Sequence, residues 1–476
     1  MRSHLSLILL TCTCILAPGA LLSACSGSSD PGLLSKGDDG GAGSSSGGGS
    51  GGSSGGSGGG SGGGSGSSSG GSSGGSSGGS GSSSGGGCDT MVHGTVLDPA
   101  GLKPVYNAIV YVPTTTLDPI ATGPTCEPCG KPPSGAPAAV GLSGPDGTFT
   151  LHGVPPGASV PIVVQIGKWR RENALIASVA ACGNTAVDTQ LTRLPKNKGE
   201  GHLPHIAIST GLDSMECALQ TMGVDPSEFT PSSGPGSIHI YQGSTSYGAT
   251  AGTGTAVAGT LWTNMSLLQQ YDMVIDACQG VAPTDKPQQS LTNINTYAAQ
   301  GGRVYLSHYE SFVVWPTAET SAWSSVATQD TAAPGGTSAT NVAIDLGFPK
   351  GGALAHWAMT AGASTTLGTI TTIGNSRDDV LGVNAPTKSW LSGTDGLTTT
   401  PHVFQMSFYA GGQSCGKVAY SDFHVSAGPT GVAQFPAECP TAMPDPTGTS
   451  LFEFFLLDTM SCAQDDSKLP VAPPLK

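Results

Sequence analysis

Short apolar runs alternate with polar, helix-compatible segments through the second half of the chain. Residues 273–275 and 304–306 are two such runs, and the segment between them closes at Gly301 and Gly302. This order predicts a strand, a helix and a second strand, parallel to the first and buried on both faces of a sheet. Asp213 follows another apolar run and is interpreted as the N-cap of a helix. Further strands are expected at 205–210, 238–241 and 417–423, and further helices at 353–359 and 451–460.

Alternating strands and helices of this kind are typical of a doubly wound, flavodoxin-like α/β domain. We expect this domain to occupy residues 199–463, followed by a C-terminal tail at 464–476. In such sheets, polar residues just beyond the strand ends line the ligand crevice. The crevice residues are expected to be Asp276, Cys278, Ser307, His308 and Glu310.

Residues 88–198 show a different pattern, with short alternating strands, Pro- and Gly-rich turns and no helical period. This pattern predicts an all-β sandwich, so we expect a multidomain chain. The segments VHGTV at 92–96 and DGTFTL at 146–151 resemble the carboxypeptidase regulatory-like family of prealbumin-like sandwiches. The resemblance implies a folding, spacing or adhesive module without peptidase chemistry.

Residues 1–24 have the features of a secretory signal peptide, with Arg2, a short apolar centre and small residues before Cys25. The ending LSAC resembles a bacterial lipobox, which implies cleavage before Cys25 and lipidation of its thiol. Ser26, in place of Asp, resembles the signal for sorting to the outer membrane. An ordinary secretory signal or a membrane span is the alternative, but the apolar run is too short to span comfortably.

From residue 43 to residue 87 every position is Gly or Ser. Such a segment has no apolar surface to bury, so residues 25–87 are expected to form a disordered tether. As a coil, the Gly/Ser segment should span roughly 35–40 Å. The net charge of −14 and the low content of charged residues, 11%, argue against nucleic acid as a partner.

Nine cysteines follow Cys25, and an exported protein retains disulfides. The first domain would hold Cys88, Cys126, Cys129 and Cys182, which can pair completely. In the second domain we predict the pairs Cys217–Cys462 and Cys415–Cys439, which leaves Cys278 as a free, buried thiol. The CEPC segment at 126–129 could also be a redox motif or half of a zinc site, but it lies in a Pro/Gly loop and no second motif completes it.

Three segments of the second domain resemble the ThuA-like trehalose-utilisation family, which belongs to the class I glutamine amidotransferase-like folds. They are YDMVI at 271–275, Y-x3-GGRV-x3-H at 297–308 and GKV-x-Y-x3-H at 416–424. In amidotransferases of this class the nucleophilic cysteine lies in an elbow after the strand that corresponds to 304–306. Here the elbow reads LSHYE, without a cysteine, so glutamine amide transfer is not expected.

The candidate catalytic residues are His308 and His424, with Glu310 and Asp422 close to them in sequence. Both histidines should follow parallel strands, so they should face one crevice. Two histidines and two carboxylates could run acid–base chemistry or hold a divalent metal, the one cofactor we consider. Alternatively, each histidine caps a strand end and Asp422 organises a loop.

Aromatic residues supply two further candidates. Trp315, His356 and Trp357 could form a wall that stacks on a sugar, although such residues more often pack in a core. The WRR segment at 169–171 could bind an acidic glycan, or it could pack at a domain seam with its arginines on backbone carbonyls.

Two functions therefore remain open. The first is an outer-membrane lipoprotein, held by its lipid, that serves as a non-catalytic binding or spacing module for a glycan or an envelope protein. The second is a carbohydrate-directed or metal-assisted hydrolase that uses a crevice around His308 and His424. Thiol redox chemistry through Cys126 and Cys129 is the third and least favoured hypothesis.

Overall fold

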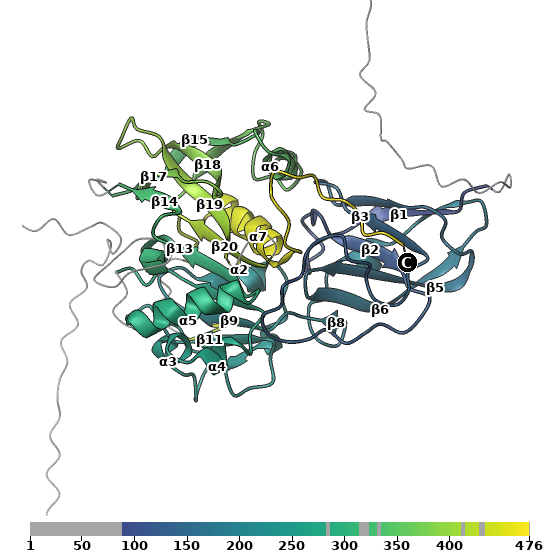
Figure 1. Ribbon diagram of the computed structural model, residues 1–476, viewed down its shortest axis with the longest axis horizontal. Helices are drawn as coiled ribbons and strands as arrows, with labels where there is room; N and C mark the ends of the chain where they lie inside the picture. Colours follow the sequence, from purple (N-terminus) through teal and green to yellow (C-terminus); the bar gives the residue numbers. More distant parts are fainter. Residues whose placement is uncertain are drawn as a thin grey trace, which may run out of the picture. The chain divides into compact units, whose positions relative to one another are not determined.

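The computed structural model describes residues 88–281, 286–313, 323–330, 335–410, 415–427 and 434–475. It shows a mixed α/β, strand-rich chain with several sheets (Figure 1). The predicted signal peptide, the lipidated Cys25 and the Gly/Ser segment lie outside the described residues. Within the described part of the chain, no helix combines the length and the apolar character needed to cross a membrane.

The first 115 or so described residues form two sheets, as their alternating pattern predicted. One sheet has the strand order β4-β1-β7, and the other has the order β3-β2-β5-β6-β8. All neighbours in the second sheet are antiparallel. The strands are β1 (Met91–Thr95), β2 (Ile109–Val112), β3 (Ala139–Leu142), β4 (Thr148–Leu151), β5 (Gly157–Ile166), β6 (Trp169–Val179), β7 (Asn184–Ala186) and β8 (Gly201–His202).

A ten-stranded sheet, in the order β10-β11-β9-β12-β13-β20-β19-β18-β15-β16, dominates the rest. The strands from β10 to β20 in this order are parallel, and those from β20 to β16 are antiparallel. The parallel strands are β9 (Ile206–Ser209), β10 (Phe229–Pro231), β11 (Ile238–Tyr241), β12 (Met273–Asp276), β13 (Arg303–Ser307) and β20 (Gly416–Ser421). The others are β15 (Ala339–Ile344), β16 (Thr369–Ile373), β18 (Lys388–Thr394) and β19 (His402–Ala410), while β14 (Ala327–Gln329) pairs with β17 (Val380–Val383).

Helices cover both faces of the parallel strands, which explains why these strands are apolar on both sides. On β12, Met273 and Ile275 join the buried cluster of α2 and α7, whereas Val274 joins the cluster of α3 and α5. The helices are α1 (Thr189–Thr192), α2 (Met215–Thr221), α3 (Ala258–Trp262), α4 (Met265–Leu268), α5 (Gln288–Ala299), α6 (Pro349–Thr360) and α7 (Pro446–Met460). Two 3-10 helices, η1 (Pro226–Glu228) and η2 (His308–Val313), complete the described elements.

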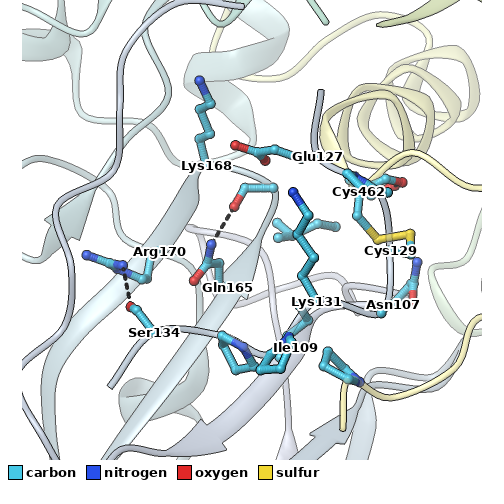
Figure 2. A pocket seen from close by; sticks show the side chains of 18 of the residues that line it. Asn107, Ile109, Glu127, Cys129, Lys131, Ser134, Gln165, Lys168, Arg170 and Cys462 are labelled. Carbon is cyan, nitrogen blue, oxygen red and sulfur yellow. Dashed lines mark hydrogen bonds between the residues drawn. A yellow bond between two sulfur atoms is a disulfide. The ribbon is translucent and has the colours of Figure 1, made fainter. Parts of the chain in front are cut away.

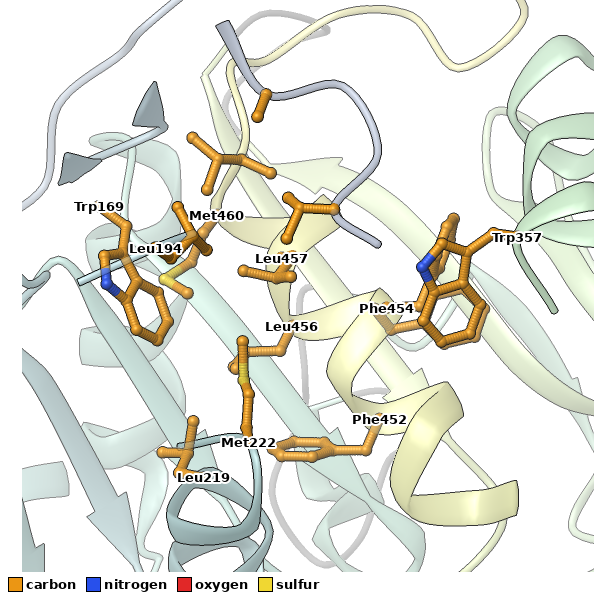
Figure 3. Close-up of a cluster of buried hydrophobic side chains, with 14 of the residues drawn as sticks. Trp169, Leu194, Leu219, Met222, Trp357, Phe452, Phe454, Leu456, Leu457 and Met460 are labelled. Atoms are coloured by element: carbon orange, nitrogen blue, oxygen red, sulfur yellow. The ribbon is translucent and has the colours of Figure 1, made fainter. Parts of the chain in front are cut away.

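Helix α7 is buried from Gly448 to Met460 and lies at the centre of the larger hydrophobic core. The same cluster includes sandwich residues such as Trp169 and Leu194, so the sandwich and the ten-stranded sheet share one continuous core (Figure 3). The aromatic rings of Trp357 and Phe454 lie 5.1 Å apart, centroid to centroid. A core shared in this way makes the two parts depend on each other for stability.

Polar contacts follow the same seam. The indole Nε1–H of Trp357 donates to the Pro104 carbonyl at 2.7 Å, and Lys103 forms a 2.9 Å ion pair with Glu453. In the WRR segment, Trp169 is buried and donates to the Pro195 carbonyl at 3.0 Å. Arg170 donates to the Asp118 carbonyl at 3.0 Å and is paired with Glu172. Trp169 belongs to the shared core and Arg170 binds a backbone carbonyl, which is the packing that the second alternative predicted.

The disulfides differ from the predicted pattern. The two predicted pairs, Cys217–Cys462 and Cys415–Cys439, are both wrong. The structure instead pairs Cys88 with Cys182, Cys126 with Cys415, Cys129 with Cys462, and Cys217 with Cys439. Cys278 is the free, buried cysteine in the described part of the chain, as predicted.

The physical reason lies in the loop around Cys126. Its backbone forms a short ladder with the end of the chain, because Ala463 N donates to the Glu127 carbonyl at 2.8 Å and Cys129 N donates to the Ala463 carbonyl at 3.1 Å. The loop therefore leaves the sandwich and docks beside α7. The prediction had assumed that each domain pairs its own cysteines.

Candidate functional site

Four neighbouring parallel strands, β9, β12, β13 and β20, bring polar side chains to one edge of the sheet. Asp213 follows β9, Cys278 follows β12, His308 follows β13 and His424 follows β20. These residues meet because the carboxyl ends of parallel strands share an edge. A Cβ atom at Gly211 would lie 2.3 Å from the Cys278 carbonyl oxygen, so only glycine allows the two loops to approach this closely.

Asp213 and His424 form a buried dyad. The Oδ1 atom of Asp213 lies 2.9 Å from Nδ1 of His424 and also accepts the backbone N–H of Val425 at 3.1 Å. The other ring nitrogen, Nε2, accepts from Nε of Arg377 at 3.4 Å. Both contacts require the same tautomer, with the proton on Nδ1 and a lone pair on Nε2.

Ser307 connects this dyad to the loop that carries Cys278. Its Oγ donates to Oδ2 of Asp213 at 2.7 Å and accepts the backbone N–H of Cys278 at 2.9 Å. Asp213 therefore accepts three hydrogen bonds in the interior. It does not form the side-chain cap predicted for it, because α2 begins after Ser214 without a side-chain cap.

Cys278, His308 and Asp379 form a second chain of contacts. The Cys278 Sγ lies 3.4 Å from Nδ1 of His308, and Nε2 of His308 lies 3.2 Å from Oδ2 of Asp379. Burial lowers the pKa of His308 to about 4, against the opposing effect of the hydrogen bond that His308 donates to Asp379. Burial also raises the pKa of the Cys278 thiol well above its usual range. The histidine is therefore neutral at pH 7 and the thiol is protonated.

His308 has a backbone φ of +40°, which is uncommon for a residue with a Cβ. Residues in this region cluster at ligand sites, where the surrounding structure holds the strain. The Oη of Tyr420 donates to the His308 carbonyl at 3.1 Å, which helps to fix this conformation. The ring of His308 lies 4.7 Å from that of His424, centroid to centroid, in an edge-to-face arrangement.

Asp422 lies beside this cluster and is fully buried. It contacts the Tyr420 hydroxyl at 3.1 Å and accepts the Asp379 backbone N–H at 2.9 Å. Burial, followed by the nearby Asp379 charge, raises its pKa well above the usual range. Asp379 connects this cluster to solvent. Its side chain is 31% exposed, whereas His308, His424 and Asp422 are buried.

Glu310 points in another direction. It is buried in an ion pair with Lys286, whose Nζ also lies 3.2 Å from Asp276. The candidate site therefore contains His308, His424 and Asp422 in one cluster, while Glu310 belongs to a neighbouring ion-pair network.

The two aromatic candidates that lie among the described residues, His356 and Trp357, do not form a wall beside these histidines. Trp315 lies outside the described residues, His356 is exposed on α6, and Trp357 is buried in the seam. Sequence reasoning missed Arg377 and Asp379, which follow no recognisable motif, and it assigned Asp213 a different role.

A second feature is a pocket of about 340 Å³ at the sandwich (Figure 2). Side chains of β2 and β5, including Ile109 and Gln165, line it together with the loop that carries Cys129 and the C-terminal residues Pro470 and Val471. The Cys129–Cys462 disulfide lies in its wall.

Comparison with known proteins gives no family. No family model matches the chain, and neither does any curated protein. A solved structure of a cytoplasmic protein from Salmonella typhimurium matches 55% of this chain and 100% of its own length, with 14% identity and a TM-score of 0.28. Similarity at this level supports no argument about fold or function.

Proposed function

We propose that this chain is a hydrolase whose reaction centre is the buried cluster around His308 and His424. One observation carries the proposal. Each imidazole has one nitrogen held by a carboxylate, Asp379 or Asp213, and its other nitrogen is left as a lone pair inside the cluster. Carboxylate–imidazole pairs of this kind orient general bases in hydrolytic enzymes.

In the proposed reaction, Arg377 gives up its hydrogen bond to Nε2 of His424. That nitrogen then takes a proton from water as the water oxygen bonds to the electrophilic carbon of the substrate. The bond from that carbon to the leaving group then breaks, and the leaving group takes the proton from His424. Asp213 stabilises the imidazolium between these two transfers. Arg377, whose Nε lies 3.4 Å from this nitrogen, supplies positive charge for an oxyanion.

The substrate class that we propose is a glycoside or an ester of a carbohydrate. The support is the sequence resemblance to the ThuA-like family, together with parallel strands that are covered by helices on both faces. The LSAC ending before Ser26 supports a lipid anchor in the outer membrane, so the substrate would belong to the cell envelope or its surroundings.

The test compares His308→Ala and His424→Ala with the control His356→Ala, an exposed histidine on α6. The full-length protein is assayed against p-nitrophenyl glycosides and p-nitrophenyl esters. We expect the first two variants to lose at least about 100-fold in kcat/KM, because a general base contributes that much, with melting temperatures near that of the wild type. Equal activity in all three variants, or no activity in the wild type, would reject the hydrolase.

The pocket at the sandwich favours a second candidate function, a binding module for a glycan or an envelope protein. Its volume is in the range of small-molecule sites, and it combines apolar walls with Gln165 and Lys131 (Figure 2). Calorimetric titration with envelope glycan fragments should give heat that Gln165→Ala reduces and Gln269→Ala, a change outside the pocket, does not. Equal heats in both variants would remove the pocket as the binding site.

A further inference from the structure

We propose that Cys278, His308 and His424 bind a zinc-class divalent cation. Its binding is argued from the geometry alone. A role in catalysis rests on the proposed hydrolase function and would replace the general base, because a cation on Nε2 of His424 occupies the lone pair that would otherwise take the proton. The donor atoms of these three residues, one sulfur and two ring nitrogens, lie within 4.8 Å of one another. All three residues are buried.

The two histidines present the correct atoms. His308 donates from Nε2 to Asp379 and so faces Cys278 with the lone pair of Nδ1. His424 donates from Nδ1 to Asp213, which leaves its lone pair on Nε2. A metal requires a lone pair on each ring, and these hydrogen bonds fix that tautomer before the metal arrives.

The surrounding contacts match those of known metal sites. Histidines that bind a metal almost always donate their other N–H to a carboxylate, a carbonyl or water. Both histidines here meet that condition through carboxylates, which come from different loops. The thiol sulfur of Cys278 accepts the backbone N–H of Gly280 at 3.3 Å, a contact that would also stabilise a bound thiolate.

The distances require little movement. Tetrahedral zinc places neighbouring sulfur and nitrogen ligands about 3.3–3.7 Å apart. Sγ of Cys278 and Nδ1 of His308 already lie 3.4 Å apart. The remaining pairs, which lie within 4.8 Å, must close by up to about 1.5 Å. Arg377 must also give up its hydrogen bond to Nε2 of His424, because the cation takes that lone pair.

The ligand set selects the metal. One thiolate and two imidazoles suit zinc and cobalt, whereas magnesium and calcium take oxygen ligands. A second group of possible donors, His308, Asp379 and Asp422, lies nearby. It is the weaker choice, because Asp422 is already engaged with the Tyr420 hydroxyl and the Asp379 N–H. Three protein ligands leave a fourth position for water, as in catalytic zinc sites.

Binding of the cation also changes the protonation state of Cys278. The Cys278 thiol becomes a thiolate when it bonds to the cation, and its proton leaves to solvent. One proton is therefore released for each cation bound. No electron is transferred, because zinc and cobalt remain divalent.

The test is titration of the metal-free, full-length protein with Co²⁺. Thiolate ligation gives a sulfur-to-cobalt charge-transfer band in the near ultraviolet, and tetrahedral cobalt gives intense visible bands. We expect one Co²⁺ per chain with both signatures, and displacement of cobalt by Zn²⁺. The readout is specific because His205 and His239, whose Nε2 atoms lie 3.5 Å apart, could bind cobalt only through nitrogen.

Three variants test which residues bind the cobalt. Cys278→Ser should remove the charge-transfer band, and His424→Ala should weaken cobalt binding by about 100-fold or more. His239→Ala should change neither. A wild-type titration without the band overturns the proposal whatever the variants do, and so does a band that survives in Cys278→Ser.

The two proposals fail separately. Stoichiometric cobalt with its thiolate band but no hydrolysis rejects the hydrolase and keeps the metal site. Hydrolysis that persists in protein stripped of metal, in the presence of a chelator, keeps the hydrolase and shows that the cation has no part in it.

Discussion

The Oδ1 atom of Asp213 lies 2.9 Å from Nδ1 of His424, a residue 211 positions further along the chain. Asp213 also accepts from Ser307 Oγ and from Val425 N, so its carboxylate connects the loop after β9 with the end of β13 and the loop after β20. It sets the tautomer of His424 through this contact. The chemistry of the cluster therefore depends on a residue that need not touch a substrate.

Asp213→Asn tests this role. An asparagine amide can donate to Nδ1, which would place the ring proton on Nε2 and remove the lone pair from the cluster. We expect Co²⁺ affinity to fall about 10–100-fold. Asp225→Asn, a matched change at the N-cap of η1, should leave the affinity unchanged. Wild-type affinity in Asp213→Asn, with the fold intact by circular dichroism, would contradict a tautomer-setting role.

The disulfide pattern can be checked by mapping. Alkylation of the unreduced, denatured protein should label Cys278 alone among the nine cysteines from Cys88 onward, because the other eight are paired. Digestion without reductant should then yield peptides that join residue 126 to 415 and residue 129 to 462. A peptide that joins Cys217 to Cys462 would refute the observed pairing.

Stability should depend on pH through Glu438. Burial raises its pKa to about 7, from 4.5, beside the buried carboxyl of Glu216. A raised pKa means that the folded protein holds the proton more tightly than the unfolded chain. The contribution is therefore complete below pH 4.5 and is lost as the pH rises to about 7.

The size of this effect is at most about 3 kcal/mol. Denaturant unfolding at pH 5 and pH 8 should show the wild type losing stability between the two values, and Glu438→Gln losing less. Identical losses in the two proteins would show that this carboxyl does not titrate in the folded state as described.

We propose membrane attachment on the basis of the LSAC segment. This attachment would depend on the thiol sulfur of Cys25. Cys25→Ala should move the protein from the membrane fraction to the soluble fraction, because the lipid would have no thiol to join. Ser26→Asp should keep the protein lipidated and redirect it to the inner membrane. A Cys25→Ala protein that stays with membranes after a high-salt wash would rule out the lipid anchor.

Much of the parallel sheet could be predicted from sequence, because its strands are short apolar runs with polar residues at their ends. β12 and β13 were expected at 273–275 and 304–306 and lie at Met273–Asp276 and Arg303–Ser307. The antiparallel half could not be predicted. Strands such as β15 and β18 are rich in Thr, Ser and Ala, and they lack the apolar alternation that marks a strand in sequence.

The candidate site was predictable only where a residue directly follows an apolar strand. His308 and His424 do so, and the structure brings them together. Asp213 has the local pattern of a helix cap, and nothing in its neighbours shows that its partner lies in a distant loop. Asp379 comes from the poorly patterned region between residues 316 and 400. Contacts between such distant segments are set by tertiary packing, which a local pattern does not encode.

The pairs Cys126–Cys415 and Cys129–Cys462 have one more consequence, for how the protein responds to proteolysis. Each bond joins the sandwich loop to residues about 300 positions later. A single peptide-bond cleavage anywhere between residues 130 and 414 would therefore leave two fragments that are still covalently linked. Such a nicked molecule would migrate as an intact chain on a non-reducing gel and separate into two bands only with a reductant. Damage to one exposed loop would not release half of the protein.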